Sequence, residues 1–390
     1  MTKVLLTESY LENIADAIRA KNGTQDTYTP GEMSEAINNI ESVGDYFNTT
    51  ISSGSYGSGG YKKVYKNLIP NTVQNTGTSC NYMFQGYTGN NISTLPNFNT
   101  TNVTSMEGMF RDCSNLTSLD ISNFNTNNIS GSMNGMFMSC PKLESINFPS
   151  TFHTGSNIDG LFLGTGIESI DLTGFDTSRT TSMQTVFKNC ASLKSVDLSS
   201  WDISKAYTMG GFFEGCSNLE TVNLNVKVKN NSNSIPINDL FYNCGKLQSV
   251  DLRNFVTNIV SADFLFNGCG SLETINMDGV NLGLINGQSS NLGAFRSAFK
   301  NCNSLVNLIF GNNLGAALSS SSSVNQFNVD LTSCSLLTHD SLVDFLTKLA
   351  DVSDKGAPVA VTTVRLGATN LAKLTAEEIA IATNKGWTVS

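Results

Sequence analysis

Residues 106–124 read MEGMFRDCSNLTSLDISNF, and this spelling returns throughout the middle of the chain. Residues 187–198 read FKNCASLKSVDL, and residues 241–252 read FYNCGKLQSVDL. The phenylalanine that opens each copy recurs at Phe84, Phe110, Phe137, Phe162, Phe187, Phe213, Phe241, Phe266 and Phe299. Adjacent copies are 25 to 33 residues apart. Self-similarity at such a period predicts a solenoid.

Each copy has the pattern of one short strand and one turn. Val196 and Leu198 alternate with polar residues, which is the two-residue period of a half-buried strand. Upstream, Met183, Val186 and Phe187 have the spacing of a helix face, so a short helical turn is expected on the other wall. Burial of about six apolar side chains contributes roughly 10–15 kcal/mol, whereas ordering the backbone costs ~1–2 kcal/mol per residue. One copy is therefore unstable alone and needs neighbours on both sides.

The recurring M-x-x-M/V-F-x-x-C-x-x-L-x-x-L/V-D-L-S-x-F spelling resembles the BspA-like class of leucine-rich repeats over residues 80–334. That class occurs in bacterial surface proteins and in tail proteins of phages and prophages. The resemblance implies an α/β fold: a leucine-rich-repeat solenoid of ~25-residue repeats, with a short N-terminal helical segment and a C-terminal α/β cap. The spelling departs at Gly86, Tyr87 and Thr165 and in the long spacing over 277–299, where irregular coils or protruding loops are expected.

Four parts are expected along the chain. They are an N-terminal helical docking segment (1–43), a Gly/Ser-rich linker with a first irregular coil (44–79), the solenoid (80–335) and a C-terminal cap (336–390). Long or Asn/Ser-rich gaps at 149–157, 226–237, 278–291 and 312–325 are expected to emerge as loops at an edge. In the cap, Thr375 and Glu378 form a capping-box pattern, and the last helix should end near Lys385.

The first segment shows two short amphipathic helical patterns. Their apolar stripes consist of Leu11, Ile14, Ile18, Met33, Ile37 and Ile40. These stripes are expected to pair between subunits or to dock on a partner, although a simple helical cap on the solenoid is the alternative. Residues 6–33 resemble the N-terminal docking segment of tail and baseplate-associated proteins of phages that infect Gram-positive bacteria. Residues 366–390 resemble the C-terminus of many phage tail proteins.

Composition narrows the functional classes. Charged residues make up 14% of the chain, and the net charge is −9, so a nucleic-acid partner is not expected. No signal peptide and no run of 18 apolar residues is visible, so neither export nor membrane insertion is expected. Seven of the nine cysteines share one repeat position and are expected to stack as reduced, buried thiols. They are Cys113, Cys140, Cys190, Cys216, Cys244, Cys269 and Cys302.

The search for catalytic motifs finds none. The two histidines, His153 and His339, have no partner at metal-ligand spacing. Phosphate-binding loops, nucleophile elbows and C-x-x-C pairs are absent from the sequence. We therefore expect no enzymatic activity, no cofactor and no metal, and a cell-wall hydrolase built on scattered carboxylates remains a remote alternative.

The strand face is the candidate binding surface. One polar residue follows the buried strand position in successive copies: Asp120, Asn147, Asp171, Asp197, Asn223, Asp251 and Asn276. With the neighbouring serines and threonines they would line a groove for a glycan or a protein receptor. A hydrogen-bonded polar ladder without binding function explains the same pattern and is slightly favoured, since repetition alone produces it. Trp201 occupies the slot of Phe124, Phe175 and Phe255 and is expected in the core.

These features together favour a phage tail receptor-binding protein located at the tail tip or fibre of the virion and made in the host cytoplasm. Its expected partners are a bacterial cell-surface glycan or protein receptor and, through the N-terminus, other tail or baseplate proteins. Tail adhesins that it resembles are usually oligomeric and often trimeric, so a homo-oligomer is expected. The main alternative is a BspA-like adhesin on the bacterial cell surface that binds host proteins.

Overall fold

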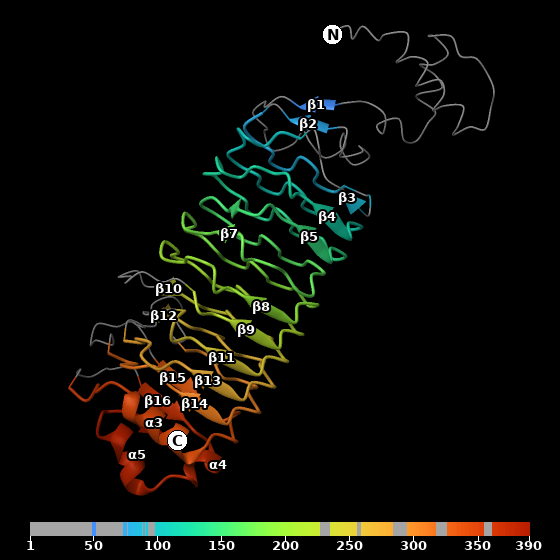
Figure 1. Cartoon of the computed structure of the whole chain (residues 1–390). Helices are drawn as coiled ribbons and strands as arrows, with labels where there is room; N and C mark the ends of the chain where they lie inside the picture. The colour runs from blue at the N-terminus through green and yellow to red at the C-terminus, as the bar shows by residue number, and fades with distance from the viewer. Residues whose placement is uncertain are drawn as a thin grey trace, which may run out of the picture.

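A computed structural model of the 390-residue chain gives the structure. It describes residues 49–51, 73–75, 77–87, 89, 91–92, 98–226, 235–255, 259–283, 295–316, 326–354 and 361–390. The docking stripes, from Leu11 to Ile40, lie outside the described residues, as do most of the expected edge loops after 226. Successive coils stack along one axis, with the C-terminal helices at one end (Figure 1). The predicted leucine-rich-repeat solenoid is therefore confirmed.

One wall of the solenoid is a column of short parallel strands. They are β3 (Asn91–Ile92), β4 (Ser118–Asp120), β5 (Ser145–Asn147), β8 (Ser195–Asp197), β9 (Thr221–Asn223), β11 (Ser249–Asp251), β13 (Thr274–Asn276) and β14 (Asn307–Ile309). They form the sheets β3-β4-β5, β8-β9 and β11-β13-β14. Equivalent residues of adjacent coils lie opposite each other, as Val196 does to Val222. Val196 is buried between exposed Ser195 and Asp197, as the alternation predicts.

A second column of strand pairs lies on another wall (Figure 1). It contains β6 (Phe152–His153) with β7 (Phe175–Asp176), and β10 (Ile235–Pro236) with β12 (Ile259–Ser261), both parallel. Nearer the N-terminus, β1 (Thr49–Ile51) pairs with β2 (Val73–Asn75). The expectation of an edge loop over 149–157 is wrong for its centre. Phe152 is fully buried and pairs with Phe175, so this stretch belongs to the stack.

The third wall consists of turns, and the helical turn expected at Met183–Phe187 is wrong. Thr185 and Asn189 have φ values of 55° and 59°, which interrupt a right-handed helix. Alternate N–H groups bond to the next coil, whereas those between them, such as that of Lys188, bond to a carbonyl of their own turn. Thr185 donates to the carbonyl of Gly210 at 3.0 Å, and Phe187 donates to that of Phe212 at 2.8 Å. Apolar spacing alone did not distinguish these two arrangements.

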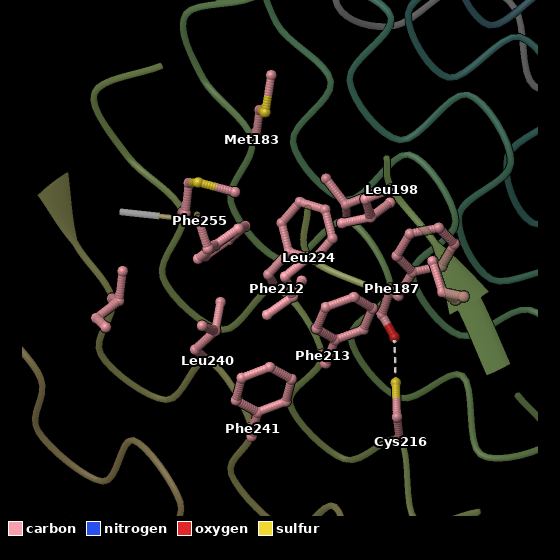
Figure 2. Close-up of a cluster of buried hydrophobic side chains, with 14 of the residues drawn as sticks. Met183, Phe187, Leu198, Phe212, Phe213, Cys216, Leu224, Leu240, Phe241 and Phe255 are labelled. Carbon is pink, nitrogen blue, oxygen red and sulfur yellow. Dashed lines mark hydrogen bonds between the residues drawn. The ribbon is translucent and has the colours of Figure 1, made fainter. Parts of the chain in front are cut away.

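The core is built around one continuous stack of phenylalanine rings. The nine repeat phenylalanines from Phe84 to Phe299 have neighbouring ring centroids 5.1 to 6.0 Å apart and interplanar angles of 4° to 29°. Figure 2 shows Phe187, Phe213 and Phe241 in this arrangement. Trp201 is fully buried and stacks on Phe175 at 6.1 Å, so its predicted core position is confirmed. Each ring therefore packs against the coil before and the coil after.

The cysteines form a second buried column beside the rings. All nine are free and buried, which confirms the prediction of reduced structural thiols. From Cys113 onward, each thiol donates to the carbonyl of the repeat phenylalanine one coil earlier, at 3.0 to 3.6 Å. Figure 2 shows this bond from Cys216 to Phe187. Burial raises the pKa of Cys269 to about 12, so the thiol stays neutral and keeps its donor hydrogen.

The C-terminal part has its own small α/β arrangement. Strands β15 (Gln326–Asp330), β16 (Val361–Arg365) and β17 (Thr388–Val389) form a parallel sheet, and the helices are α3 (His339–Lys348), α4 (Ala368–Leu371) and α5 (Ala376–Thr383). Leu342, Phe345 and Leu346 are the buried apolar face of α3. The capping box of Thr375 and Glu378 is present at the start of α5, as predicted.

Helix α3 closes the open edge of the last strand in the column. The Ser341 hydroxyl accepts the N–H of Leu308 at 3.0 Å, and a carboxylate oxygen of Asp344 accepts the N–H of Phe310 at 3.1 Å. The Lys348 ammonium donates to the carbonyl of Phe310 at 2.9 Å. These side chains replace the backbone groups of a further coil, and they block an edge that could pair with another strand.

The cysteine column predicts the thiol reactivity of the protein. In the native chain, without reductant, none of the nine thiols should react with a thiol reagent such as DTNB within minutes, because the thiols are buried and protonated. In denaturant all nine should react. A count below nine after unfolding would reveal a disulfide and contradict the column as described.

His339 predicts a pH dependence of the cap. Its ring nitrogens lie 3.2 Å from an Asp340 oxygen and 2.8 Å from a Glu378 oxygen, and these carboxylates raise the pKa of His339. The protonated form is favoured by folding, so this stabilisation is complete below the unfolded pKa of about 6.5 and is lost as the pH rises through the folded pKa. Between pH 6 and pH 8, the melting temperature should fall more for the wild type than for His339→Gln. Equal falls for the two proteins would contradict the link.

Candidate binding face

The seven predicted site residues form one column, which we call the ladder. Its members are Asp120, Asn147, Asp171, Asp197, Asn223, Asp251 and Asn276. Each occupies the last residue of its strand, except Asp171, whose coil has no strand at this point. Asp120 and Asn276 are half-buried, and the other five are exposed. The column continues to Ile309, where the polar character ends.

Six of the seven ladder side chains close a turn of their own backbone. One side-chain oxygen accepts the N–H two residues further on, at 2.8 to 3.1 Å, in the pairs 120/122, 171/173, 197/199, 223/225, 251/253 and 276/278. Such Asx turns favour Asp and Asn for a local reason. The exception is Asn147, which is followed two residues later by Pro149, and proline has no N–H to donate. Chain reversal at the end of the strand therefore explains the residue type.

The ladder members also contact one another across coils. The Asn147 amide donates to an Asp120 oxygen at 3.2 Å, and a hydrogen bond from Asn223 helps to lower the pKa of Asp197. Neighbouring strands lie about 4.8 Å apart, so a column of carboxylates alone would place like charges in direct opposition. Asn147 and Asn223 separate carboxylates and reduce this repulsion, and only Asp171 and Asp197 are adjacent carboxylates in the ladder.

The ladder carboxylates are held in their ionised form. The backbone N–H and the hydroxyl of Thr173 lower the pKa of Asp171, and Ser199 and Arg253 lower the pKa values of Asp197 and Asp251 respectively. A carboxylate with a lowered pKa is a poor general acid near neutral pH. The column offers fixed acceptors for hydroxyl, amide or cationic groups.

A flanking column of charged residues escaped the sequence analysis. It consists of Glu144, Glu168, Lys194, Glu220 and Glu273, which precede the strand serine or threonine in five of the seven ladder copies; the other two have Thr117 and Gln248 there. The Lys194 ammonium lies 2.6 Å from a Glu168 oxygen, and both side chains are more than half exposed. The sequence already showed this column, because its charged residues recur at the same position of the repeat. Within the described coils, no aromatic side chain belongs to either column, so stacking on a ligand ring has no platform on this face.

The other titratable groups lie elsewhere. His153 bonds to Asp176 at 2.8 Å on the wall of β6 and β7, and His339 lies in the cap. In the described ranges no three His, Cys, Asp or Glu side chains are placed to hold a metal ion. An open hollow of about 630 Å³ beside the cap is lined partly by Lys348 and Lys385, whose ammonium groups bond to backbone carbonyls. No helix among the described residues is long and apolar enough to cross a membrane.

Comparisons with known proteins give one family match and several similar solved structures. A family model described as "Mycoplasma protein of unknown function, DUF285" matches residues 78–154 and 156–278. The chain has no match among curated proteins. A leucine-rich cell surface protein from Faecalibacterium prausnitzii is 16% identical, with 67% of this chain and 88% of that chain covered, at a TM-score of 0.28.

Two further solved structures are similar to the chain. TLR13, in a complex with single-stranded RNA, is 15% identical over 70% of this chain and 36% of that chain, at a TM-score of 0.27. A leucine-rich-repeat protein from Eubacterium ventriosum is 13% identical over 72% and 84%, at a TM-score of 0.23. The two segments matched by the family model make up more than half of the 390 residues. The chain therefore belongs to the DUF285 family of BspA-like leucine-rich-repeat proteins.

Proposed function

We propose that this chain is a non-catalytic adhesion protein that recognises a bacterial cell-surface receptor through the ladder face. The observation that carries the proposal is the register of the ladder: each coil offers one outward acceptor at the same position of the same wall. The stacked core holds these groups at a fixed spacing, so binding costs little conformational entropy.

The chemistry of the face suits a hydroxyl-rich or amide-rich target. Ionised Asp171, Asp197 and Asp251 accept hydrogen bonds, and Asn147 and Asn223 offer both donors and acceptors. Each contact is exposed and therefore weak. Repetition along the ladder multiplies the contacts, and a homo-oligomer would multiply them again by avidity. A surface glycan or an extended protein receptor fits these requirements.

We place this adhesion at the tip of a phage tail. The terminal segments support this setting, because residues 6–33 and 366–390 resemble phage tail proteins. In this proposal, residues 1–43 dock to other tail or baseplate proteins, and the solenoid faces the host cell. A second candidate is an adhesin on the surface of a bacterial cell, which the description of the matching family as a Mycoplasma family favours.

Ladder variants test the binding face. Asp171→Lys, Asp197→Lys and Asn223→Lys combined should weaken binding to host cells at least tenfold, since cations replace acceptors. Asp202 provides a matched control in the same coil as Asp197, because it closes the same kind of turn, at 2.9 Å to Ser204, on a different wall. Asp202→Lys should therefore bind normally and lose as much stability as Asp197→Lys alone. Unchanged binding of the triple variant would remove the ladder from the proposal.

Deletion of residues 1–43 tests the setting. The shortened chain should still bind cells but should fail to enter phage particles, as measured by immunoblotting of purified particles. Incorporation at the wild-type level would contradict docking through this segment. Labelling of the full-length chain on intact producing cells, with none in particles, would favour the surface adhesin. Release of soluble sugars or peptides from purified cell walls would contradict a role without catalysis.

A further inference from the structure

The wall of turns carries a second distinctive surface, around Phe264. Each coil of this wall has two residues with a left-handed backbone, and at the first of the two positions φ lies between 52° and 63°. The residues at this position are Tyr82, Gly108, Gly135, Gly160, Thr185, Gly211, Asp239, Phe264 and Ser297. Glycine adopts this conformation without strain, whereas a bulky side chain there is an outlier.

Phe264 has no local bond that would explain its presence. Tyr82, the other aromatic residue in this column, uses its hydroxyl to bond with Glu107. Small polar residues such as Asp239 and Ser297 tolerate the left-handed region more readily. A phenyl ring has no polar atom that could form such a bond. The reason for a phenylalanine at this position must therefore lie in the contacts that its ring makes. A strained residue that the fold does not require points to function.

The ring of Phe264 organises two side chains from neighbouring coils. The guanidinium carbon of Arg296 lies 4.4 Å from the Phe264 ring centroid, and the ring of Tyr242 lies 6.1 Å away at 83°. The N–H of Phe264 donates to the carbonyl of Arg296 at 2.9 Å, which fixes the two coils in register. We call Asp239, Tyr242, Phe264 and Arg296 the Phe264 patch.

Arg296 stacks on the Phe264 ring, and among the described residues no carboxylate forms an ion pair with it. Its Nε is buried and has no partner, and no hydrogen bond or ion pair joins its guanidinium to any described residue. Asp263 uses an oxygen to accept the backbone N–H of Arg296, at 3.1 Å. By contrast, Lys188 on the same wall pairs with Glu214 at 2.7 Å. A stacked guanidinium whose Nη donors bond to none of the described residues is ordered in advance for a planar oxyanion.

The surroundings select among anionic partners. Asp239 interacts electrostatically with Arg296, and Asp263 accepts the Arg296 backbone N–H, so these carboxylates would repel an anion that brings no hydroxyl donors for them. A polymer with one acid group per ring and many hydroxyls suits all the groups present. Its carboxylate can pair with Arg296, its hydroxyls can donate to Asp239, and a ring can pack against half-exposed Tyr242.

We propose that the Phe264 patch binds an acidic polysaccharide of the uronic-acid type, with Arg296 pairing to the carboxylate and Tyr242 packing on the sugar ring. This inference deepens the proposed adhesive function by naming a ligand class. The patch lies on a different wall from the ladder, however, so either can fail alone. Phe264 is a positioning residue here, because it fixes Tyr242 and Arg296.

Titration of the full chain with polygalacturonate, dextran and polyglutamate tests the proposal. Only polygalacturonate should bind. Arg296→Gln should weaken binding at least tenfold, and Arg296→Lys should only partly restore it, because lysine lacks the planar fork. The control Lys300→Gln removes the same charge from the next turn of this wall and should change affinity less than twofold. Equal losses for Arg296→Gln and Lys300→Gln, no binding by the wild type, or equal binding of polyglutamate would overturn the assignment.

Phe264→Gly separates function from packing. Glycine is the commonest residue in this column, so the variant should keep the melting temperature within about two degrees and lose at least tenfold in affinity. A melting temperature lower by many degrees with unchanged affinity would show that the ring is only structural. Asp197→Lys should leave polygalacturonate binding intact. Loss of cell binding in that variant alone would then be assigned to the ladder rather than to the patch.

Discussion

The hydrogen bonds of each coil are completed only by the next coil. On the turn wall, Phe187 donates to Phe212 and Thr185 to Gly210, and on the strand wall the parallel register repeats the same dependence. A coil therefore has no complete internal bonding of its own, in contrast to a helix. This constraint explains why one copy cannot fold alone and why equivalent residues lie above one another along the stack.

Stacking places equivalent residues of successive coils in a column. A residue type is favoured in a column when its side chain can pack against, or bond to, the equivalent residue of the next coil. Phenyl rings at 5.1 to 6.0 Å pack on both faces. A thiol column works because sulfur is small and apolar and still donates to the phenylalanine carbonyl of the coil before. The ladder mixes carboxylates with amides and has one adjacent carboxylate pair, Asp171 and Asp197, since a pure carboxylate column would repel itself. The stack ends where α3 supplies side chains in place of the next backbone.

The sequence predicted the features that recur in every coil. It did not predict the conformation of the turn wall or the contacts that close the last strand. The period, the buried position of Val196, the core position of Trp201 and the column of buried, reduced thiols all followed from spacing and residue type. The turn wall was predicted as helical, because Met183, Val186 and Phe187 fit either period and left-handed φ values leave little trace when Thr185 or Asn189 replaces glycine. The edge-closing role of Ser341 and Asp344 depends on tertiary contact and has no local pattern. The ladder residues were placed on one face, but their turn-closing role requires the coordinates.

In a repeat protein, a residue indicates function most clearly when it differs from the residue type that the backbone and the stacking favour at its repeat position. Asp197 satisfies its column, because the turn alone would select Asp or Asn there, so its identity carries little information about a ligand. Phe264 violates its column, since the backbone at that position favours glycine and the ring makes no bond that the turn needs. Its contacts with Tyr242 and Arg296 give the ring a role that stacking does not supply. Two walls of one scaffold can thus contribute differently to adhesion: a uniform face that follows from the fold, and a local patch that the fold alone does not explain.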